Sequence, residues 1–190
     1  MKFFMERENV EQYMIMVEGY DPTFIINKLN KYLAKGSSLL ELGMGPGHDL
    51  RILAKDYNVV GSDNSNVFIE RFKSENTGIE AIYIDAVEMN IDRKFDCIYS
   101  NKVLQHLKKN EFITSLENQK KNLNEGGIIF MTLWKGDYKE EVMFDGELRF
   151  TYYLEKDVKE IVENNYEILA LEAYTEADEG DSLLVVLQKQ

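Results

Sequence analysis

Three glycines at alternate positions, Gly43, Gly45 and Gly47, follow a short apolar run in this sequence and precede an amphipathic segment. Glycine has no Cβ, so such a turn can adopt positive φ angles and lets the backbone approach a ligand closely. A strand, a glycine turn and a helix bind nucleotide-like ligands in open α/β sheets. We therefore expect a ligand of this kind here, although an ordinary tight turn shares the pattern.

Carboxylates accompany the glycine turn. Glu41 lies two residues before Gly43, and Asp63 lies 20 residues after it, at the end of a second predicted strand. A carboxylate at that position can accept hydrogen bonds from both hydroxyl groups of a ribose. Asp85 ends a third predicted strand, where it contacts a ligand, caps the short helix predicted to follow, or does both.

The sequence has two histidines. His106 follows a fourth predicted strand and is a candidate general base. The alternative is a histidine that packs against the sheet and hydrogen-bonds the backbone. His48 falls in the first turn of a predicted helix, and we interpret its role as local.

Aromatic residues are candidates for lining a substrate pocket, although aromatics in strands more often belong to the core. The full set comprises Tyr13, Tyr20, Tyr99, Trp134, Tyr138, Tyr152 and Tyr153. From it we select Tyr13, Tyr20, Trp134 and Tyr138 as substrate-binding candidates. The polar, glycine-punctuated segment 135–153 is the expected specificity segment, because binding loops gather at the rim of a rigid scaffold.

Strands and helices alternate through the middle of the chain, as a parallel sheet with crossover helices requires. Strands are predicted at 38–43, 58–63, 80–84, 95–100 and 128–134, and helices at about 46–56, 65–75 and 109–123. Residues 124–127 are predicted to terminate the last of these helices. The strand at 128–134 is continuously apolar and is therefore expected to be central.

The C-terminal part follows a different pattern. Residues 135–149 predict a loop or small hairpin, and residues 154–164 predict a helix. The strands predicted at 166–174 and 182–189 are joined by a connection too short for a parallel crossover, so they must be antiparallel. The predicted fold class is thus α/β: a doubly wound, Rossmann-like, mostly parallel seven-stranded sheet with a C-terminal antiparallel pair.

A chain of 190 residues fits a single domain with a substantial core. We divide residues 1–190 into a helical lead-in (1–35), a cofactor-binding core (36–134) and a substrate loop with the C-terminal strand pair (135–190). The lead-in either caps the sheet or folds over the ligand as a lid.

These motifs resemble those of the class I S-adenosylmethionine-dependent methyltransferases. Residues 39–50 resemble motif I, in which an acidic residue precedes a G-x-G-x-G turn. Residues 84–86 resemble the motif that hydrogen-bonds the adenine amino group. Residues 95–107, FDCIYSNKVLQHL, resemble the fourth motif and its successor in small-molecule methyltransferases. The resemblance spans about Leu39 to Trp134, with a looser likeness to the C-terminal strand pair.

The resemblance implies that the cofactor is S-adenosylmethionine and that a methyl group passes in line to a small molecule. It implies that Glu41 reaches the amino group of the methionine moiety, often through water, and that the backbone of Met44 and Gly45 meets the carboxypropyl chain. The expected cofactor-binding residues are Glu41, Gly43, Met44, Gly45, Gly47, Asp63, Asn64, Asp85, Ala86 and Ser100. The acceptor, the methylated element and the oligomeric state stay open.

Two other functions remain open at this stage. The first is an NAD(P)-dependent oxidoreductase, which would use the same turn and Asp63. Against it, His48 replaces the third glycine of the G-x-G-x-x-G fingerprint. A hydride-transfer Tyr-x-x-x-Lys motif is also broken, because Tyr153 is followed four residues later by Asp157. The second is a non-catalytic S-adenosylmethionine-binding protein.

Composition limits the partners. The net charge of −12 repels nucleic acid, and the lysines at 108–109 and 120–121 are interleaved with acids. The longest apolar run, 128–134, is too short to span a bilayer, and residues 1–8 lack the apolar core of a signal peptide. Cys97 is the single cysteine, so we expect a buried thiol in a reducing cytoplasm. The sequence has no Cys/His cluster with zinc spacing, so we expect no metal.

Overall fold

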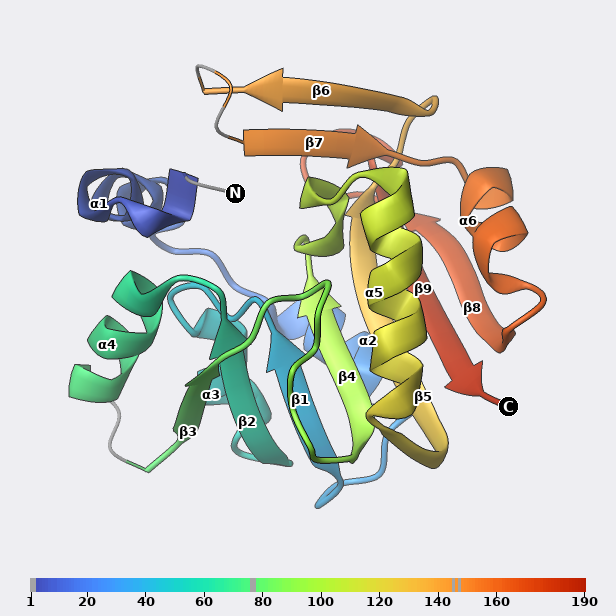
Figure 1. The fold of residues 1–190 in the computed structure, drawn as a ribbon, viewed down its shortest axis with the longest axis horizontal. Coiled ribbons are helices and arrows are strands. Elements are labelled where there is room, and N and C mark those ends of the chain that lie inside the picture. Colours follow the sequence, from blue (N-terminus) through green and yellow to red (C-terminus); the bar gives the residue numbers. More distant parts are fainter. Residues whose placement is uncertain (1–2, 76–77, 145, 147) are drawn as a thin grey trace.

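A seven-stranded sheet forms the centre of the computed structural model, which describes residues 3–75, 78–144, 146 and 148–190 (Figure 1). The strands run in the order β3-β2-β1-β4-β5-β9-β8. Their bounds are β1 Ser38–Leu42, β2 Asn58–Asp63, β3 Glu80–Tyr83, β4 Phe95–Asn101, β5 Leu123–Trp134, β8 Tyr166–Tyr174 and β9 Ser182–Lys189. Strands β1 to β5 pair in parallel, and β9 is antiparallel to both of its neighbours. The predicted fold class is confirmed.

Helices cover both faces of the sheet (Figure 1). Helices α2 (Thr23–Leu29) and α3 (His48–Leu53) bury apolar side chains on one face, and α5 (Lys109–Lys121) and α6 (Glu155–Val162) do so on the other. Side chains alternate along a strand, so Leu39 packs with the first pair of helices and Leu40 with the second. Burial on both faces explains why β1 and β5 read as continuous apolar runs.

The strand order reverses between β1 and β4, which are neighbours in the centre of the sheet. The chain leaves β1 toward β2 and β3, whereas after β4 it continues on the other side toward β5. Crossovers that diverge in this way leave a crevice beyond the carboxyl ends of the two central strands. The glycine turn follows β1 and residues 102–107 follow β4, so both segments border this crevice.

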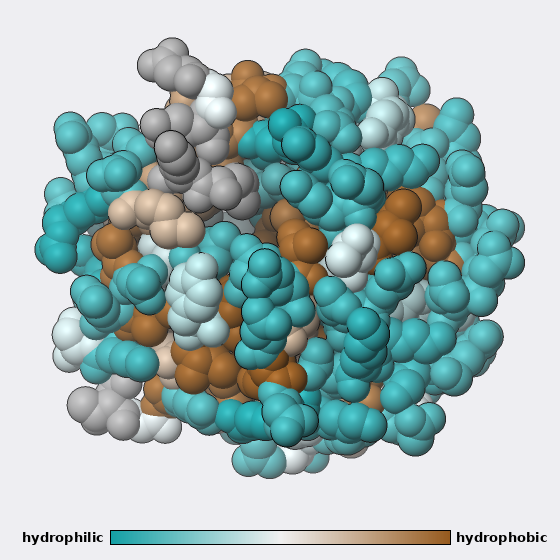
Figure 2. Space-filling model, in the orientation of Figure 1, coloured by the Kyte–Doolittle hydropathy of each residue, from teal (hydrophilic) through white to brown (hydrophobic). Residues whose placement is uncertain are grey.

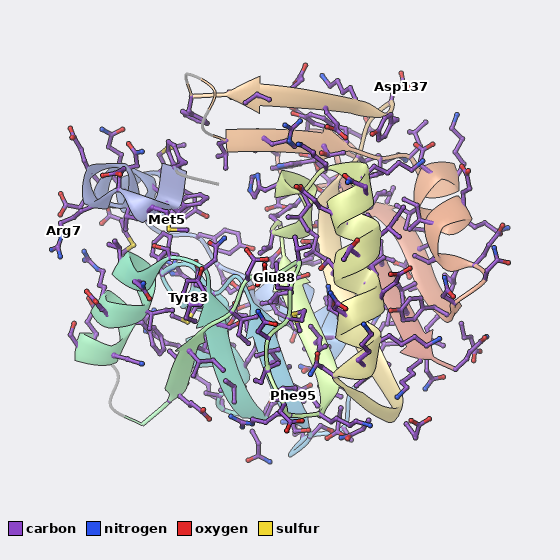
Figure 3. All side chains as sticks on the ribbon, in the orientation of Figure 1. Met5, Arg7, Tyr83, Glu88, Phe95 and Asp137 are labelled. Carbon is purple, nitrogen blue, oxygen red and sulfur yellow. The ribbon has the colours of Figure 1, made fainter. Side chains whose placement is uncertain are left out.

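Two further segments lie beyond the same edge of the sheet (Figure 1). One comprises the 3₁₀ turn η1 (Phe3–Met5) and helix α1 (Arg7–Met16), and the other is a hairpin of β6 (Lys139–Met143) and β7 (Leu148–Tyr152). The Phe3 and Phe144 rings touch, with centroids 5.0 Å apart, so the two segments meet. Figure 3 shows Met5 beside α1, and Asp137 at the opposite end of the hairpin.

The structure corrects one prediction about the sheet. Residues 124–127 do not cap α5, which ends at Lys121; they belong to β5, which begins at Leu123. Gly126 has φ +71°, and the pairing of β4 with β5 shifts register between Phe95 and Cys97. Gly126 therefore allows an irregularity within strand β5, which requires a positive φ as a helix terminus does.

Two further boundaries differ from those predicted. Helix α3 is shorter than 46–56, because Gly47 at its N-cap has the left-handed φ of +78°. The short helix expected after Asp85 is a single turn, closed by a hydrogen bond from the Met89 N–H to the Asp85 carbonyl. Helix α4 (Asn66–Glu75) agrees with its prediction within one residue.

Candidate active site

Two adjoining cavities lie beyond the carboxyl ends of β1, β2 and β4. Cavity A, of about 100 Å³, is lined mainly by the ends of β2 and β3 and by the segment after β4. Cavity B, of about 340 Å³, extends toward α1 and the hairpin. Seven residues line both and mark the junction: Phe4, Tyr13, Gly43, Gly45, Asn101, Lys102 and His106. Most surface side chains on the face shown in Figure 2 are hydrophilic.

The glycine turn passes very close to the segment after β4. Gly43 has φ +76°, and a Cβ added there would lie 2.6 Å from a methyl carbon of Val103. Gly47 meets α4 instead, because its Cβ would lie 2.4 Å from the Phe72 ring. Gly43, Met44 and Gly45 line the cavities, whereas Gly47 lines neither and packs α3 against α4.

Asp63 holds the glycine turn in place at the floor of cavity A. Its Oδ2 accepts the Gly45 N–H at 2.9 Å, and its Oδ1 accepts the Ser65 N–H at 2.8 Å. Burial disfavours the charged form and raises the pKa of the Asp63 carboxyl to about 6, although these backbone bonds oppose the shift. The bond to Gly45 therefore ties the glycine turn to the end of β2.

Asp85 lies at the other side of cavity A with Asn64 and Ala86. Its Oδ1 accepts the N–H groups of Val87 at 2.8 Å and Glu88 at 3.2 Å, so the capping role is present. The carboxylate also lines the cavity, so a ligand can reach it. Both roles suggested by the sequence are therefore compatible with this geometry.

Glu41 is a buried carboxylate with an unused oxygen. The residue is 3% exposed, and its Oε2 has no hydrogen-bond partner among the described residues. Burial raises its pKa well above the ordinary value, and the negative charges of Asp49 and Asp63 raise it further. Glu41 is not among the residues that line either cavity. This arrangement suits a cationic ligand group that reaches the carboxylate through a bridging water.

The raised pKa of Glu41 predicts a pH-dependent stability of the ligand-free protein. The folded state holds the proton of Glu41 more tightly than the unfolded state, so stability is lost as pH rises from the unfolded pKa, about 4.3, toward the folded value. In the wild type, this effect lowers the free energy of unfolding by up to about 1.4 kcal/mol per pH unit. Glutamine does not titrate, so we expect Glu41→Gln to lack this decrease. Urea unfolding of both proteins between pH 5 and pH 8 measures the difference. Parallel pH profiles would contradict a buried, titrating Glu41.

Sequence reasoning missed a polar network at the wall of cavity B. Asp49, in the first turn of α3, accepts hydrogen bonds from the Tyr99 hydroxyl and from Asn101 Nδ2 at 3.0 Å. Asn101 Nδ2 also donates to the Tyr20 hydroxyl at 2.7 Å. Burial raises the pKa of Asp49. An acid at the start of the helix after the glycine turn was the available signal.

Asn101 occupies the place that the sequence suggested for Ser100. Alternate residues of a strand point to opposite faces, and here Asn101 lines both cavities while Ser100 lines neither. The Ser100 hydroxyl is buried, and it has no hydrogen-bond partner among the described residues. The expected contact of Ser100 with the cofactor therefore has no cavity to support it.

Lys102 anchors the segment after β4. It has a left-handed φ of +58°, and its N–H donates to Thr132 Oγ1 at 3.0 Å. Its ammonium donates to Ser182 Oγ at 2.6 Å and to the Leu133 carbonyl at 3.2 Å, and pairs with Glu176 Oε2 at 3.2 Å. Burial lowers the pKa of Lys102 to about 8, although Glu176 opposes the shift.

His106 lies in the 3₁₀ turn η2 (Leu104–His106) and lines both cavities. Its Nδ1 is 2.6 Å from the Arg149 carbonyl oxygen, so Nδ1 carries a proton and Nε2 keeps its lone pair. The ring packs edge-on against Phe150, and burial lowers the pKa of His106. The hydrogen bond to the backbone that a structural histidine would make is therefore present. The same tautomer leaves the Nε2 lone pair available for a general base.

The aromatic candidates divide into two groups. Tyr13, Tyr20 and Trp134 line cavity B, together with Phe144, Leu148 and Phe150 from the hairpin segment. Four others line neither cavity: Tyr99 and Tyr153 are fully buried, Tyr138 is 45% exposed, and Tyr152 is the last residue of β7. Tyr138 was a substrate-binding candidate, and its hydroxyl instead donates to Glu140 within the hairpin segment.

The described part of the chain contains no group of three or more His, Cys, Asp or Glu side chains arranged to hold a metal ion. Within the same residues, no helix combines the length and apolarity needed to cross a bilayer.

Comparison with known proteins supports the family resemblance. Residues 39–127 match a family model described as a methyltransferase domain. The chain is 34% identical over 111 residues to the ribosomal protein L11 methyltransferase of Thermosipho melanesiensis, which covers 55% of this chain and 40% of that protein. The chain spans 30% to 40% of the length of the curated relatives it matches.

Solved structures share the fold at low sequence identity. One is the 1,6-didemethyltoxoflavin-N1-methyltransferase of Burkholderia thailandensis, with TM-score 0.77, 14% identity, and coverage of 94% of this chain and 82% of that one. Another is the N-methyltransferase NodS of Bradyrhizobium japonicum, with TM-score 0.68, 17% identity, and coverage of 88% and 84%. Both were crystallised with S-adenosylhomocysteine. These structures confirm the fold that the resemblance implies, and the family model confirms the resemblance to a methyltransferase domain over residues 39–127.

Proposed function

We propose that this chain, which carries the fold and the glycine-turn segment of the class I methyltransferases, transfers a methyl group from S-adenosylmethionine to a small molecule. The observation that carries the proposal is the convergence of Gly43, Gly45, Asp63 and Asp85 on cavity A, at the crevice between β1 and β4. These four residues are not adjacent in the sequence, because they follow or end three different strands, so the fold is what brings them together.

The residues present suit the chemical groups of S-adenosylmethionine. Asp63 offers carboxylate oxygens to ribose hydroxyls, and Asp85 with Asn64 offers acceptors and donors to an adenine edge. The unpaired oxygen of buried Glu41 suits the ammonium of the methionine moiety. We place the reacting centre at the junction of the cavities, where Gly43, Asn101 and His106 lie.

When bound, S-adenosylmethionine supplies an electrophilic methyl group on a sulfonium, which is a good leaving group. The protein's residues then have two tasks, which are to orient the acceptor and to exclude water. Cavity B provides largely apolar walls for both tasks. Nε2 of neutral His106 can take a proton from an acceptor that must lose one.

The segments beyond the sheet edge support further parts of the proposal. Phe4 and Tyr13 line both cavities, and Ser65 Oγ donates to the Phe4 carbonyl, so we assign the lid role to residues 3–20 of the lead-in, whereas α2 caps the sheet. Phe144, Leu148 and Phe150 support a specificity role for segment 135–153. A cytoplasmic location belongs to the same proposal, supported by the buried lone thiol of Cys97.

A thermal-shift panel with S-adenosylmethionine, S-adenosylhomocysteine, NAD and NADP tests the cofactor class. We expect the first two to raise the melting temperature by several degrees at about 100 times Kd. Stabilisation by NAD or NADP alone would instead support the oxidoreductase. Stabilisation by the adenosyl compounds, without methyl transfer in a broad acceptor screen, would support a non-catalytic binding protein.

A further inference from the structure

We infer that cavity B is built for an alkylamine that carries an aromatic ring and is protonated at neutral pH, and that it discriminates against anionic acceptors. The inference rests on the proposed function in one respect: the ligand of cavity B is the methyl acceptor only if the protein is a methyltransferase. Its basis is the combination of three features of the cavity wall: aromatic faces, an unused carboxylate oxygen, and a lysine whose donors are all engaged.

The aromatic side chains of cavity B come from three different parts of the chain. Tyr20 follows α1, Trp134 ends β5, and Phe150 lies in β7. Several aromatic rings in one cavity wall suit a ligand with a planar ring, which stacks on them offset or edge-on. The same rings attract cations, and Lys102 Nζ already lies 3.4 Å from the centroid of the Trp134 ring.

Glu176 supplies the carboxylate. Its Oε2 pairs with the Lys102 ammonium at 3.2 Å and accepts the Tyr174 hydroxyl at 2.9 Å. Ser182 Oγ also donates to Oε2 at 3.4 Å, so the contacts of this carboxylate with described residues all fall on Oε2 and leave Oε1 unused. The side chain is 26% exposed and lines cavity B, so an incoming ammonium can pair with Oε1 without breaking an existing bond.

Lys102 does not offset this preference. It is the one lysine or arginine among the described residues that line cavity B. Its three ammonium hydrogens are matched by three acceptors, on Leu133, Ser182 and Glu176. An anionic acceptor would therefore face Asp49 and Glu176, and the lining residues that the structure describes include no lysine or arginine free to pair with it.

The proton balance agrees with an amine. An ammonium group must lose one proton to expose the lone pair that attacks the methyl carbon, and the new N–C bond forms as the C–S bond breaks. Neutral His106, with Nδ1–H on the Arg149 carbonyl, can receive that proton at Nε2. The protonated imidazole returns it to solvent when the products leave.

Trp134 makes the inference testable without turnover, because it is the only tryptophan of the chain and lines cavity B. Its fluorescence, excited at wavelengths that phenyl groups do not absorb, can be titrated with 2-phenylethylamine, 2-phenylethanol and 3-phenylpropionate. The full chain is used, with and without S-adenosylhomocysteine. We expect the amine to bind at least roughly tenfold more tightly than the carboxylate, with the alcohol between them.

Glu176→Gln is expected to reduce the preference for the amine over the carboxylate to less than about threefold. The matched control is Glu172→Gln in β8, which pairs with Lys28 and lies outside both cavities. It should keep the wild-type preference. Equal or tighter binding of 3-phenylpropionate, or no response to any of the three below about 10 mM, would overturn the inference.

The outcomes separate this inference from the proposed function. Stabilisation by S-adenosylhomocysteine without a preference for the amine removes the acceptor class and leaves the methyltransferase assignment. A preference for the amine without any response to the adenosyl compounds supports the ligand class of cavity B and removes the methyltransferase assignment.

Discussion

Asp63→Ala is expected to weaken binding of S-adenosylhomocysteine by at least about tenfold. Two effects act together. A buried carboxylate at the floor of cavity A is lost to the ligand, and the Gly45 and Ser65 N–H groups lose their acceptor. The glycine turn then loses one of its bonds to the end of β2, while the Gly43 and Met44 N–H groups still donate to the Ser62 carbonyl. Isothermal titration calorimetry measures the change directly.

Asp63→Asn separates the two effects, because the amide keeps one oxygen acceptor. We expect its affinity to fall between wild type and Asp63→Ala. Asp56→Ala is the matched control, since Asp56 pairs with Lys35 and lies outside both cavities. Urea unfolding of all variants shows whether the fold is retained. Unchanged affinity in a folded Asp63→Ala would refute a cofactor-binding role.

The fold was largely predictable because burial sets the sequence pattern. Strands β2, β8 and β9 have the predicted bounds, since polar and glycine residues interrupt the apolar runs at both ends. The error at residues 124–127 arose because the same two glycines suit a helix terminus and a strand irregularity. Only the pairing of β5 with β4 decides between them, and pairing is a long-range property.

The site was predictable where the topology of the sheet alone determines the position of a residue. Gly43, Gly45, Asp63 and Asp85 line cavity A because the topology brings the ends of parallel strands together. Asp49, Asn101 and Lys102 were missed, because their contacts depend on side-chain direction at one residue. Tyr138 was wrongly selected for the same reason: its hydroxyl donates to Glu140, and Phe150 of β7 lines the cavity instead.

Three carboxyl groups with raised pKa values lie close to the glycine turn: Glu41, Asp49 and Asp63. Burial of carboxylates costs folding free energy unless a cation or donors compensate. Such a cost is tolerated where a ligand supplies the compensation, and a cationic ligand supplies it best. The electrostatics of the ligand-free site therefore agree with a sulfonium cofactor and with the cationic acceptor inferred for cavity B.

His106→Ala is expected to lower kcat by about 10² to 10⁴ for an acceptor that must lose a proton, while the affinity for S-adenosylhomocysteine stays within about twofold. The base form is required, so kcat/KM should fall as pH falls through the pKa of His106, which burial places below the ordinary histidine range. This acid limb should vanish in the variant. Steady-state kinetics across pH measures both effects.

His106→Asn distinguishes a general base from a structural histidine. The asparagine amide can still donate to the Arg149 carbonyl, which Nδ1 now contacts at 2.6 Å, but it offers no basic nitrogen at the position of Nε2. If proton removal is the role of His106, the asparagine variant is as slow as the alanine variant. If the backbone bond is the role, asparagine restores turnover and the acid limb persists in both proteins, because another group then titrates.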